Sequence, residues 1–338
     1  MKKLWTIFLA FAVLLAGCSG IQTSTPVSHS TFFAMDTVMD FQIYGDTELL
    51  KNAEEIVTDL EKKVSVTDPD SEIYAINQQG AGTLTDEAED LMKVALSMCS
   101  RTDGMLDISI YPVVRAWGFT TGAYQIPEME TLQKLLPLVD YTKIQYDSAT
   151  GQVTIPEGMT IDLGSIAKGY AGQLAAQYLR DQGVTSALLN LGGNVQTIGS
   201  KPDGTPWSIG IQDPMGSSPM MALSVSDQAV ITSGGYERYF EQDGQTYWHI
   251  MNPATGRPAR SGLLSVSVIG EQGSVCDALS TALFVMGLEK AARFWAASDD
   301  FEAIFVTDTG EIYLTEGLKN QYVLLNDYAD TQVTILER

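Results

Sequence analysis

Residue types that could do chemistry gather between Ser233 and Pro258, a segment with more turn-forming residues than a core strand would hold. The segment contains a Ser-Gly-Gly turn, Arg238 and His249, which is one of only two histidines in the chain. An imidazole has an unperturbed pKa of about 6.5, so His249 could act as a general base near neutral pH. A histidine in a strand can also be structural, and this segment alone leaves both interpretations open.

A second group of residues lies where a strand gives way to a helix. The apolar run before Asp162 is typical of a strand, and helical spacing begins near Ser165, with Lys168 close behind. Free N–H groups at a helix N-terminus, together with a nearby lysine, can bind a phosphate or a metal-bound anion. Asp162 or Ser165 could instead be an ordinary N-cap. The Gly192-Gly193 turn could admit a ligand or simply join two strands.

The helix expected to begin at Cys276 offers oxygen ligands for a cation. Asp277 and Thr281 are four residues apart, so they share one helix face, where a carboxylate and a hydroxyl could bind Mg²⁺. Asp277 could equally be a first-turn acid that interacts with the helix dipole. The same ambiguity holds for the run from Asp103 to Asp107, which could bind a ligand or form a turn followed by a capping carboxylate.

These residues must be held by a mixture of helices and strands. Apolar spacing predicts helices at 47–63, 85–101, 128–136, 165–182, 276–287 and 288–297. It predicts strands at 32–44, 143–161 (with a central turn), 186–191, 207–211, 220–225, 229–232, 265–269, 303–306, 312–315 and 332–336. Because the two kinds do not alternate regularly, an α+β fold is favoured over a doubly wound sheet. We expect one large two-lobed domain of mixed, mainly antiparallel sheets with helices, from residue 31 to residue 338.

The composition limits the classes of partner. The chain has 338 residues, of which 45% are hydrophobic, so it can build a substantial core. Its net charge of −22 opposes a nucleic-acid backbone, and an anionic substrate would need a local positive element. Cys99 and Cys276 stand in apolar, helix-like contexts, which predicts two separate buried thiols, and no Cys/His spacing indicates zinc.

The N-terminus has the pattern of an export sequence. Two lysines precede an apolar run from Leu4 to Leu15, which is shorter than a membrane-spanning helix of about 20 residues. The ending Leu15-Ala16-Gly17-Cys18 resembles the bacterial lipobox, which implies a signal peptide at 1–17 and lipidation of Cys18. A plain signal peptide or a short anchor is the alternative. Residues 18–30, with their Ser, Thr and Pro, suit a flexible tether to the extracytoplasmic side of the cell membrane.

Taken together and in order, the motifs of this chain resemble those of the ApbE family of bacterial FAD:protein FMN transferases. The resemblance covers essentially everything after the tether. The matching motifs are Met35-Asp36-Thr37, Asp70-Ser71-Glu72-Ile73 with Asn77, Asp103-Gly104-Met105-Leu106-Asp107 with Trp117-Gly118-Phe119, Asp162-Leu163-Gly164-Ser165-Ile166-Ala167-Lys168-Gly169-Tyr170, Leu191-Gly192-Gly193-Asn194, Thr232-Ser233-Gly234 with Tyr236-Glu237-Arg238, His249-Ile250 with Pro253-Ala254-Thr255-Gly256, and Asp277-Ala278-Leu279-Ser280-Thr281.

The resemblance implies a phosphoryl-group transfer that uses FAD as substrate and Mg²⁺ as cofactor. A Thr or Ser hydroxyl of a target protein attacks the FMN-side phosphorus, AMP leaves, and FMN stays on the target. Such a reaction needs charge neutralisation, an activated hydroxyl and in-line positioning. The family implies extracytoplasmic targets, such as flavin-bearing subunits of electron-transfer complexes.

The resemblance also implies roles for particular residues. It makes His249 the base, and it points to a metal site made by Asp277, Thr281 and the neighbouring Ser280, with oxygens from Ser165 or Ala167. For FAD it points to the following residues: Met35, Met105, Leu106, Asp107, Asp162, Lys168 and Met251.

Two positions depart from the family pattern. Thr67 stands where many relatives carry an aromatic residue that stacks on the cofactor, and Asn252 stands where Asp is common. The change at Thr67 leaves open how the FAD rings are held and whether some FAD is hydrolysed to FMN and AMP. Two alternatives therefore accompany the transferase: a Mg²⁺-dependent FAD pyrophosphatase, and a lipid-anchored flavin-binding protein without turnover.

Overall fold

The structure is a computed structural model that describes residues 26–338. The expected signal peptide, the expected lipidation site Cys18 and the expected tether up to residue 25 lie outside the described residues. Among residues 26–338, no helix is both long enough and apolar enough to cross a bilayer.

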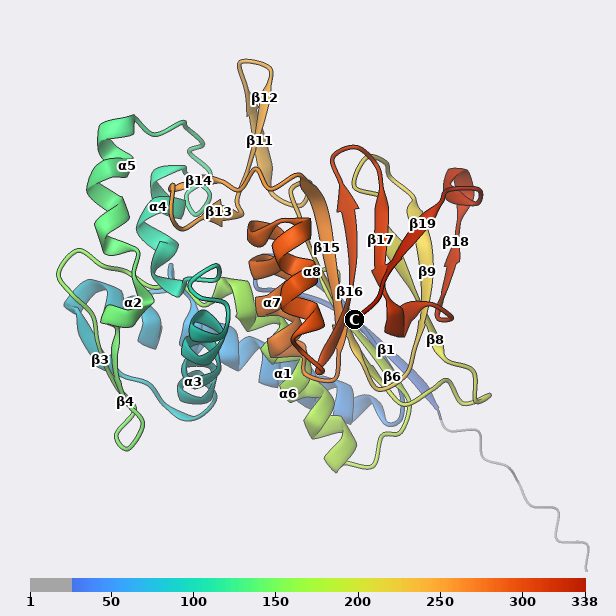
Figure 1. Cartoon of the computed structure of the whole chain (residues 1–338). Coiled ribbons are helices and arrows are strands. Elements are labelled where there is room, and N and C mark those ends of the chain that lie inside the picture. The colour runs from blue at the N-terminus through green and yellow to red at the C-terminus, as the bar shows by residue number, and fades with distance from the viewer. Residues whose placement is uncertain (1–25) are drawn as a thin grey trace, which may run out of the picture.

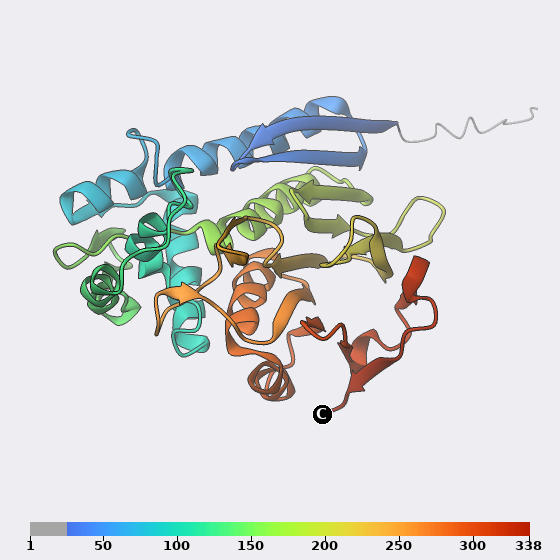
Figure 2. The same ribbon diagram turned by 90° about the horizontal axis from the view of Figure 1, so that it is seen from above.

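A nine-stranded sheet runs through the molecule (Figure 1). In spatial order its strands are β1 (Val27–Ala34), β2 (Thr37–Tyr44), β6 (Ala187–Leu191), β7 (Asn194–Ile198), β10 (Ala229–Gly234), β15 (Leu263–Gly270), β16 (Phe301–Thr307), β17 (Ile312–Thr315) and β19 (Val333–Leu336). Every neighbouring pair is antiparallel except β17 and β19. This arrangement confirms the expected α+β class with a mainly antiparallel sheet. Figure 2 shows the β1–β2 hairpin at one end of the sheet and the C-terminal strands at the other.

The central strands of the sheet are buried on both faces. In β16, Phe301, Ala303 and Phe305 enter one core, whereas Ile304 and Val306 enter another. The first core is closed by helices, and the second by a three-stranded sheet. The helices are α1 (Thr47–Val64), α6 (Gly164–Asp181), α7 (Gly273–Met286) and α8 (Leu288–Ala296), and the strands are β8 (Trp207–Gln212), β9 (Pro219–Val225) and β18 (Tyr322–Leu324). Alternating side chains therefore stabilise a helix–sheet–sheet sandwich.

A second lobe packs against one end of this sandwich (Figure 1). Its elements are α2 (Glu72–Gln79), α3 (Asp86–Arg101), α4 (Tyr111–Ala116), α5 (Met129–Leu135), β3 (Ala81–Thr83), β4 (Gln145–Asp147) and β5 (Gln152–Thr154), joined by the hairpins β11 (Tyr239–Gln242) with β12 (Gln245–Trp248) and β13 (Met251–Asn252) with β14 (Arg257–Pro258). The indole of Trp117 is fully buried and donates a hydrogen bond to the Gly256 carbonyl at 2.8 Å. This bond ties the second lobe to the segment that carries His249.

The first strand differs from the expectation. The single strand expected at 32–44 is two strands, because the chain reverses at Met35 and Asp36, whose φ angles are 50° and 60°. Two consecutive positive φ values are those of a type I′ hairpin turn. Glycine and asparagine favour this turn, and a Met-Asp sequence does not predict it. The structure also begins β1 at Val27, so four residues expected in the tether pair with β2.

Helices α6 and α7 cross at two glycines. A Cβ added at Gly169 would lie 2.2 Å from the Gly273 carbonyl oxygen and 2.6 Å from Cβ of Asp277. Only glycine permits this approach, which allows the Gly169 N–H to donate to Asp277 Oδ2 at 2.8 Å.

We expect Gly169→Ala to destabilise the fold and to displace Asp277. Forcing a methyl group into a packed contact costs about 1–3 kcal/mol or more. The cost should be high here because the neighbouring atoms, the Gly273 carbonyl oxygen and Asp277 Cβ, cannot move without the α7 backbone. Urea denaturation of this variant and of Gly172→Ala checks the prediction. At Gly172 the contacts of an added Cβ are side-chain atoms of Leu191 and Gln196, so the loss should be smaller. Equal stability of the two variants would contradict this account of the crossing.

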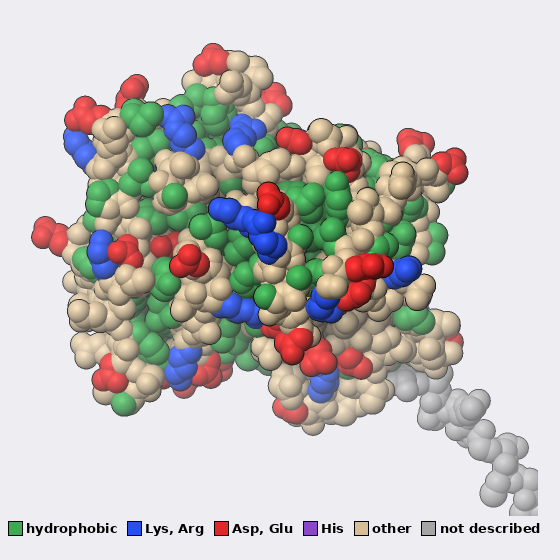
Figure 3. Space-filling model, viewed as in Figure 1, with side chains coloured by type: hydrophobic (Ala, Val, Ile, Leu, Met, Phe, Trp, Pro, Cys, Tyr) green, Lys and Arg blue, Asp and Glu red, His purple; other side chains and the backbone are tan. Residues whose placement is uncertain are grey.

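The molecular surface agrees with the charge of the sequence. On the face shown in Figure 3, Lys and Arg side chains stand singly or in small groups among acidic ones. This distribution on that face does not offer the continuous basic stripe that a nucleic-acid backbone requires. Cys99 and Cys276 are free and buried, as expected.

Candidate active site

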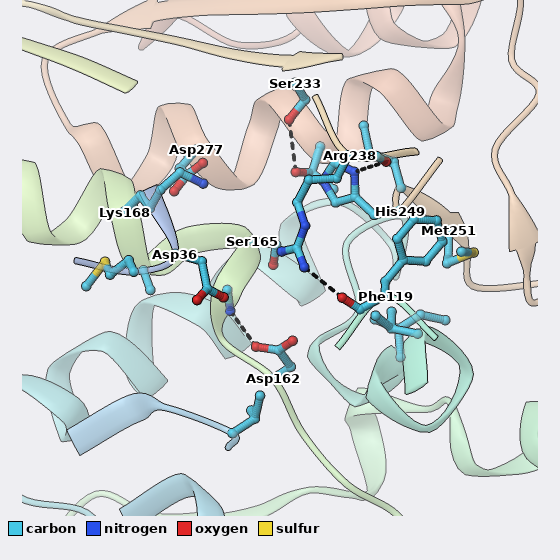
Figure 4. A pocket seen from close by; sticks show the side chains of 18 of the residues that line it. Asp36, Phe119, Asp162, Ser165, Lys168, Ser233, Arg238, His249, Met251 and Asp277 are labelled. Atoms are coloured by element: carbon cyan, nitrogen blue, oxygen red, sulfur yellow. Dashed lines mark hydrogen bonds between the residues drawn. The ribbon is translucent and has the colours of Figure 1, made fainter. Parts of the chain in front are cut away.

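A pocket of about 400 Å³ lies where the sheet, the second lobe and the β1–β2 turn meet. Every residue to which the resemblance gives a role in catalysis, FAD binding or metal binding lines this pocket, with the exception of Ser280, whereas Asp103 and the Gly192-Gly193 turn do not line it. Figure 4 shows that His249, Lys168 and Asp277 reach the pocket from separate elements. The distant motifs of the sequence therefore converge on one site.

His249 follows β12 and is held by the main chain of Arg238. Its N–H donates to the Arg238 carbonyl oxygen at 3.1 Å, and its Nδ1 lies 3.2 Å from the same oxygen. A carbonyl oxygen can only accept, so Nδ1 carries the proton in this contact and Nε2 keeps its lone pair. Enclosure in the pocket wall lowers the pKa of His249 to about 4, and the charge of Arg238 adds to the effect. At neutral pH the ring is therefore an uncharged base.

The N-terminus of α6 lies at the pocket, as the predicted anion site requires. Asp162 Oδ1 accepts a hydrogen bond from the N–H of Gly164, the first residue of the helix, at 2.8 Å. Burial raises the pKa of Asp162, although this bond and the charges of Arg238 and Lys168 oppose the effect. The N-cap of α6 is Leu163, so neither Asp162 nor Ser165 is the N-cap; Asp162 precedes the cap, bonds to the first helical N–H and lines the pocket. Ser165 and Lys168 follow on the same helix and face the pocket (Figure 4).

Asp107 also combines a structural and a pocket position. Its Oδ1 accepts from the Ser109 N–H at 2.9 Å and from the Ser109 hydroxyl at 2.6 Å, and its Oδ2 accepts from the Tyr141 N–H at 3.1 Å. These bonds close the short 3₁₀ turn Ile108–Ile110 and tie it to the turn Tyr141–Lys143. The carboxylate therefore fixes the turn that follows Met105 and Leu106, which also line the pocket.

The candidate metal ligands lie on α6, which carries Ser165 and Ala167, and on α7. Asp277 is buried, and burial raises its pKa, with the charge of Lys168 opposing. Thr281 lines the pocket one turn later, and its Oγ1 lies 3.2 Å from the Ser233 hydroxyl. Ser280 does not line the pocket, because its hydroxyl is fully buried, donates to the Asp277 carbonyl at 2.8 Å and contacts Ser233. It supports the helix beneath the site.

The donor set fits a hard cation that keeps part of its water shell. Within residues 26–338, no three His, Cys, Asp or Glu side chains are grouped as a metal cluster. Asp277 with Thr281, Ser165 and the Ala167 carbonyl would offer one carboxylate and neutral oxygens. Mg²⁺ commonly binds one or two carboxylates together with waters and substrate phosphates, so this set suits Mg²⁺ better than zinc.

The pocket is strongly acidic. Six carboxylates line it: Asp36, Glu61, Asp107, Asp162, Glu237 and Asp277. The cationic side chains among its lining residues are Lys168 and Arg238. Burial raises the pKa of Glu237, and Lys168 opposes that effect. A dianionic pyrophosphate in such a pocket requires further positive charge, which a bound cation would supply.

Several lining residues were not expected from the sequence. Glu61 of α1 accepts a hydrogen bond from the Met35 N–H at 2.7 Å and so holds the strained β1–β2 turn. Arg238 donates to the Phe119 carbonyl at 2.7 Å, which joins the hairpin to the second lobe. Arg238 and Phe119 stood within recognised motifs, whereas Glu61 is an ordinary polar position of an amphipathic helix and carries no local pattern that would have revealed it.

Comparison with known proteins places this site in a family. The model of the ApbE family matches residues 35–305. The FAD:protein FMN transferase of Klebsiella pneumoniae is 33% identical over 276 residues, which cover 80% of this chain and 85% of the relative. The enzyme of the same name from Vibrio cholerae is 31% identical over 296 residues, covering 85% and 88%.

Solved structures show the same fold. The ApbE protein of Thermotoga maritima superposes with a TM-score of 0.82 at 32% identity, covering 87% of this chain and 98% of the other. The flavin transferase ApbE of Vibrio cholerae gives a TM-score of 0.78 at 27% identity, covering 88% and 100%.

Proposed function

This chain belongs to the ApbE family, and on that premise we propose that it transfers FMN from FAD to a Thr or Ser hydroxyl of a target protein and releases AMP. It is thus a transferase of the FAD:protein FMN transferase type. The observation that carries this function is the convergence of an uncharged base, a helix N-terminus with a lysine and a buried carboxylate on one pocket. Transfer of a phosphoryl group to a hydroxyl needs those three elements.

The residues of the chain define the step. Nε2 of His249 takes the hydroxyl proton as the oxygen forms a bond to the FMN-side phosphorus. The bond from that phosphorus to the bridging oxygen breaks, and its electron pair leaves with AMP. Lys168 and the start of α6 hold the phosphates, while Met35, Met105 and Met251 offer apolar surface to the rings.

We place Mg²⁺ at Asp277 and Thr281, with Ser165 and the Ala167 carbonyl completing the protein oxygens. A bound Mg²⁺ would neutralise the charge of the pyrophosphate and of the departing AMP. The acidity of the pocket supports this placement, because two basic side chains do not balance six carboxylates and a pyrophosphate.

We also propose that the enzyme acts outside the cytoplasm while anchored through lipid on Cys18. The support is the pattern of residues 1–18, in which two lysines, a short apolar run and the Leu-Ala-Gly-Cys ending succeed one another. The target would then be an extracytoplasmic protein, such as a flavin-bearing subunit of an electron-transfer complex.

The test is to incubate the purified chain with FAD, MgCl₂ and a protein that the Vibrio cholerae relative labels. Flavin fluorescence on the acceptor in a denaturing gel, with AMP in solution, is the expected result. AMP and FMN without labelled acceptor would establish the pyrophosphatase instead. Bound FAD with neither product would indicate a flavin-binding protein, and either of these results would overturn the transferase.

The pyrophosphatase is retained as a second candidate because of Thr67. This residue lines the pocket, is exposed, and contacts the Ser65 hydroxyl at 3.2 Å. A small polar side chain leaves that wall without the aromatic surface that would stack on a ring of FAD, and water then has easier access.

We expect Thr67→Tyr to strengthen FAD binding and to reduce hydrolysis relative to transfer. An aromatic pair contributes about 0.5–1.5 kcal/mol beyond area burial, so the Kd for FAD should fall by roughly 2- to 13-fold. Titration of FAD fluorescence and the ratio of AMP to labelled acceptor measure the two effects. Thr67→Val is the control, because it replaces the hydroxyl without adding a ring. If tyrosine and valine behave alike, stacking at this position is not the missing element.

A further inference from the structure

Arg238 touches both the base and the second lobe. It stands immediately before β11, and His249 stands immediately after β12, so the two residues close the root of one hairpin. The carbonyl oxygen of Arg238 accepts from the His249 N–H and meets its Nδ1. One guanidinium nitrogen donates to the Phe119 carbonyl, which leaves other N–H groups of the fork without that bond. Figure 4 shows the side chain reaching into the pocket between Ser165 and Phe119.

The two cations that line the pocket sit in different parts of it. Lys168 directly precedes Gly169, whose N–H donates to Asp277 Oδ2 at 2.8 Å, and Figure 4 shows Lys168 beside Asp277. The guanidinium of Arg238 donates to the carbonyl of Phe119, whose ring centroid lies 6.3 Å from that of His249. Lys168 therefore belongs to the end of the pocket that holds Asp277, and Arg238 belongs to the end that holds the base.

The reacting phosphorus must lie at the end of the pocket that holds the base. A hydroxyl that gives its proton to His249 lies within hydrogen-bond reach of Nε2, and it attacks a phosphorus about 3–3.5 Å away. Of the two cationic side chains that line the pocket, Arg238 is the one whose guanidinium is held beside His249, through the Phe119 carbonyl. A guanidinium matches two phosphate oxygens at once, which a lysine cannot do.

We propose that Arg238 is a catalytic residue, whose guanidinium binds the FMN-side phosphate of FAD while its main-chain carbonyl fixes His249. This role rests on the proposed function. In this role Arg238 stabilises the negative charge that develops on the attacked phosphate. Lys168 then binds the other phosphate of the pyrophosphate. The bond to the Phe119 carbonyl orients the fork before the substrate arrives, so little reorganisation accompanies the step.

The first test compares Arg238→Met with Arg238→Lys and with the control Arg257→Met. Arg257 is exposed on the neighbouring β14 and does not line the pocket. We expect Arg238→Met to lower kcat for FMN transfer by about 100- to 1,000-fold, the effect of removing one preorganised donor, with a much smaller change in the Kd for FAD. Lysine should restore part of the loss, and Arg257→Met should retain wild-type kcat.

The second test is the pH profile of kcat/KM, which reports whether the guanidinium charge lies beside His249. The groups that face His249 are Arg238 and Lys168, with Asp162 and Glu237 elsewhere on the pocket wall. Because the positive charge of Arg238 lowers the pKa of His249, its removal should raise that pKa. The acidic limb of the profile should therefore shift to higher pH in Arg238→Met and stay in place in Arg238→Lys.

Two further readouts keep the outcome decisive. Methylguanidinium should restore activity to Arg238→Ala, because the main-chain contact with His249 survives that substitution. An Arg238→Met variant that keeps kcat within a factor of three, or that loses kcat with an unmoved acidic limb and no rescue in the alanine variant, would overturn the role of Arg238. When one of these results is obtained and the wild-type chain still labels the acceptor, only the role of Arg238 is wrong and the proposed function stands. If the wild-type chain does not label the acceptor, the proposed function itself is wrong.

Discussion

Replacing His249 with alanine is expected to abolish FMN transfer while FAD remains bound. The imidazole is held through Nδ1 by the Arg238 carbonyl oxygen, which also accepts from the main-chain N–H of His249, and Nε2 is the ring atom left to accept a proton. General-base catalysis typically contributes 10²- to 10⁴-fold, so a loss of about that size is expected in single-turnover rates. The Kd for FAD, measured from the change in flavin fluorescence, should change little, because the phosphate-binding groups of α6 are untouched.

The matched control is His249→Asn. The asparagine amide can still donate to the Arg238 carbonyl, so it preserves the root of the hairpin while it removes the base. It should therefore be as inactive as the alanine variant but as heat-stable as the wild type. Exogenous imidazole should partly restore the alanine variant. Substantial transfer activity in the asparagine variant would show that another group takes the proton.

The wild-type pH profile follows from the same contact. Enclosure and the charge of Arg238 lower the pKa of His249 to about 4, so the ring of the free enzyme stays neutral well below pH 6.5. Protonation removes the base as the pH falls through that pKa, and kcat/KM should hold its plateau down to about pH 5. A loss centred near pH 6.5 would show that the imidazole has its ordinary pKa and is not enclosed as described.

Replacing Asp277 is the second substitution with a large expected effect. This carboxylate is the one that α7 places beside Thr281, and burial raises its pKa because the ionised form is poorly solvated there. Asp277→Asn keeps the size of the side chain and can still accept from the Gly169 N–H. Changes to partners of metal ligands cost about 10- to 100-fold in metal affinity, so loss of a ligand should weaken Mg²⁺ by at least that much.

A melting experiment separates metal binding from activity. A cation that binds only the folded state raises its stability, so MgCl₂ added to the FAD-bound protein should raise the Tm of the wild type further. It should not raise the Tm of Asp277→Asn. Without Mg²⁺ the asparagine variant should be at least as stable as the wild type, since it buries no charge at this position. An equal Mg²⁺-induced shift in both proteins would remove Asp277 from the metal site.

The regular elements could be predicted because each one repeats its apolar positions. The helix expected at 47–63 is observed at Thr47–Val64, where Leu50, Ala53, Val57 and Leu60 are buried on one stripe. Asp46 caps it by accepting from the Glu48 N–H at 2.9 Å. Elements without such a repeat were missed. The strands of the β11–β12 hairpin are too short and too polar to alternate, and aromatic contacts with the second lobe support them.

The site could be predicted in part because its residues stand in local motifs. The motifs identified His249, Lys168 and Asp277 as candidate site residues, and the structure places all three in one pocket. Sequence spacing did not settle which side of a helix faces the ligand. Ser280 precedes Thr281 by one residue and is therefore rotated by about 100° from it, away from the pocket and toward Ser233. Glu61 lies 26 residues after Met35, and at that separation the spacing of residues in the sequence does not predict which side chains will be in contact.

The measurement that tests the central claim most directly is the intact mass of the acceptor after reaction, taken together with AMP in the same sample. The full chain, FAD, MgCl₂ and a protein labelled by the Vibrio cholerae relative are combined, with the His249→Asn variant in parallel. We predict a gain of one FMN less one water on the acceptor, one AMP released for each FMN attached, and no gain with the variant. AMP release without a change in acceptor mass, or an unchanged yield with the variant, would contradict the account.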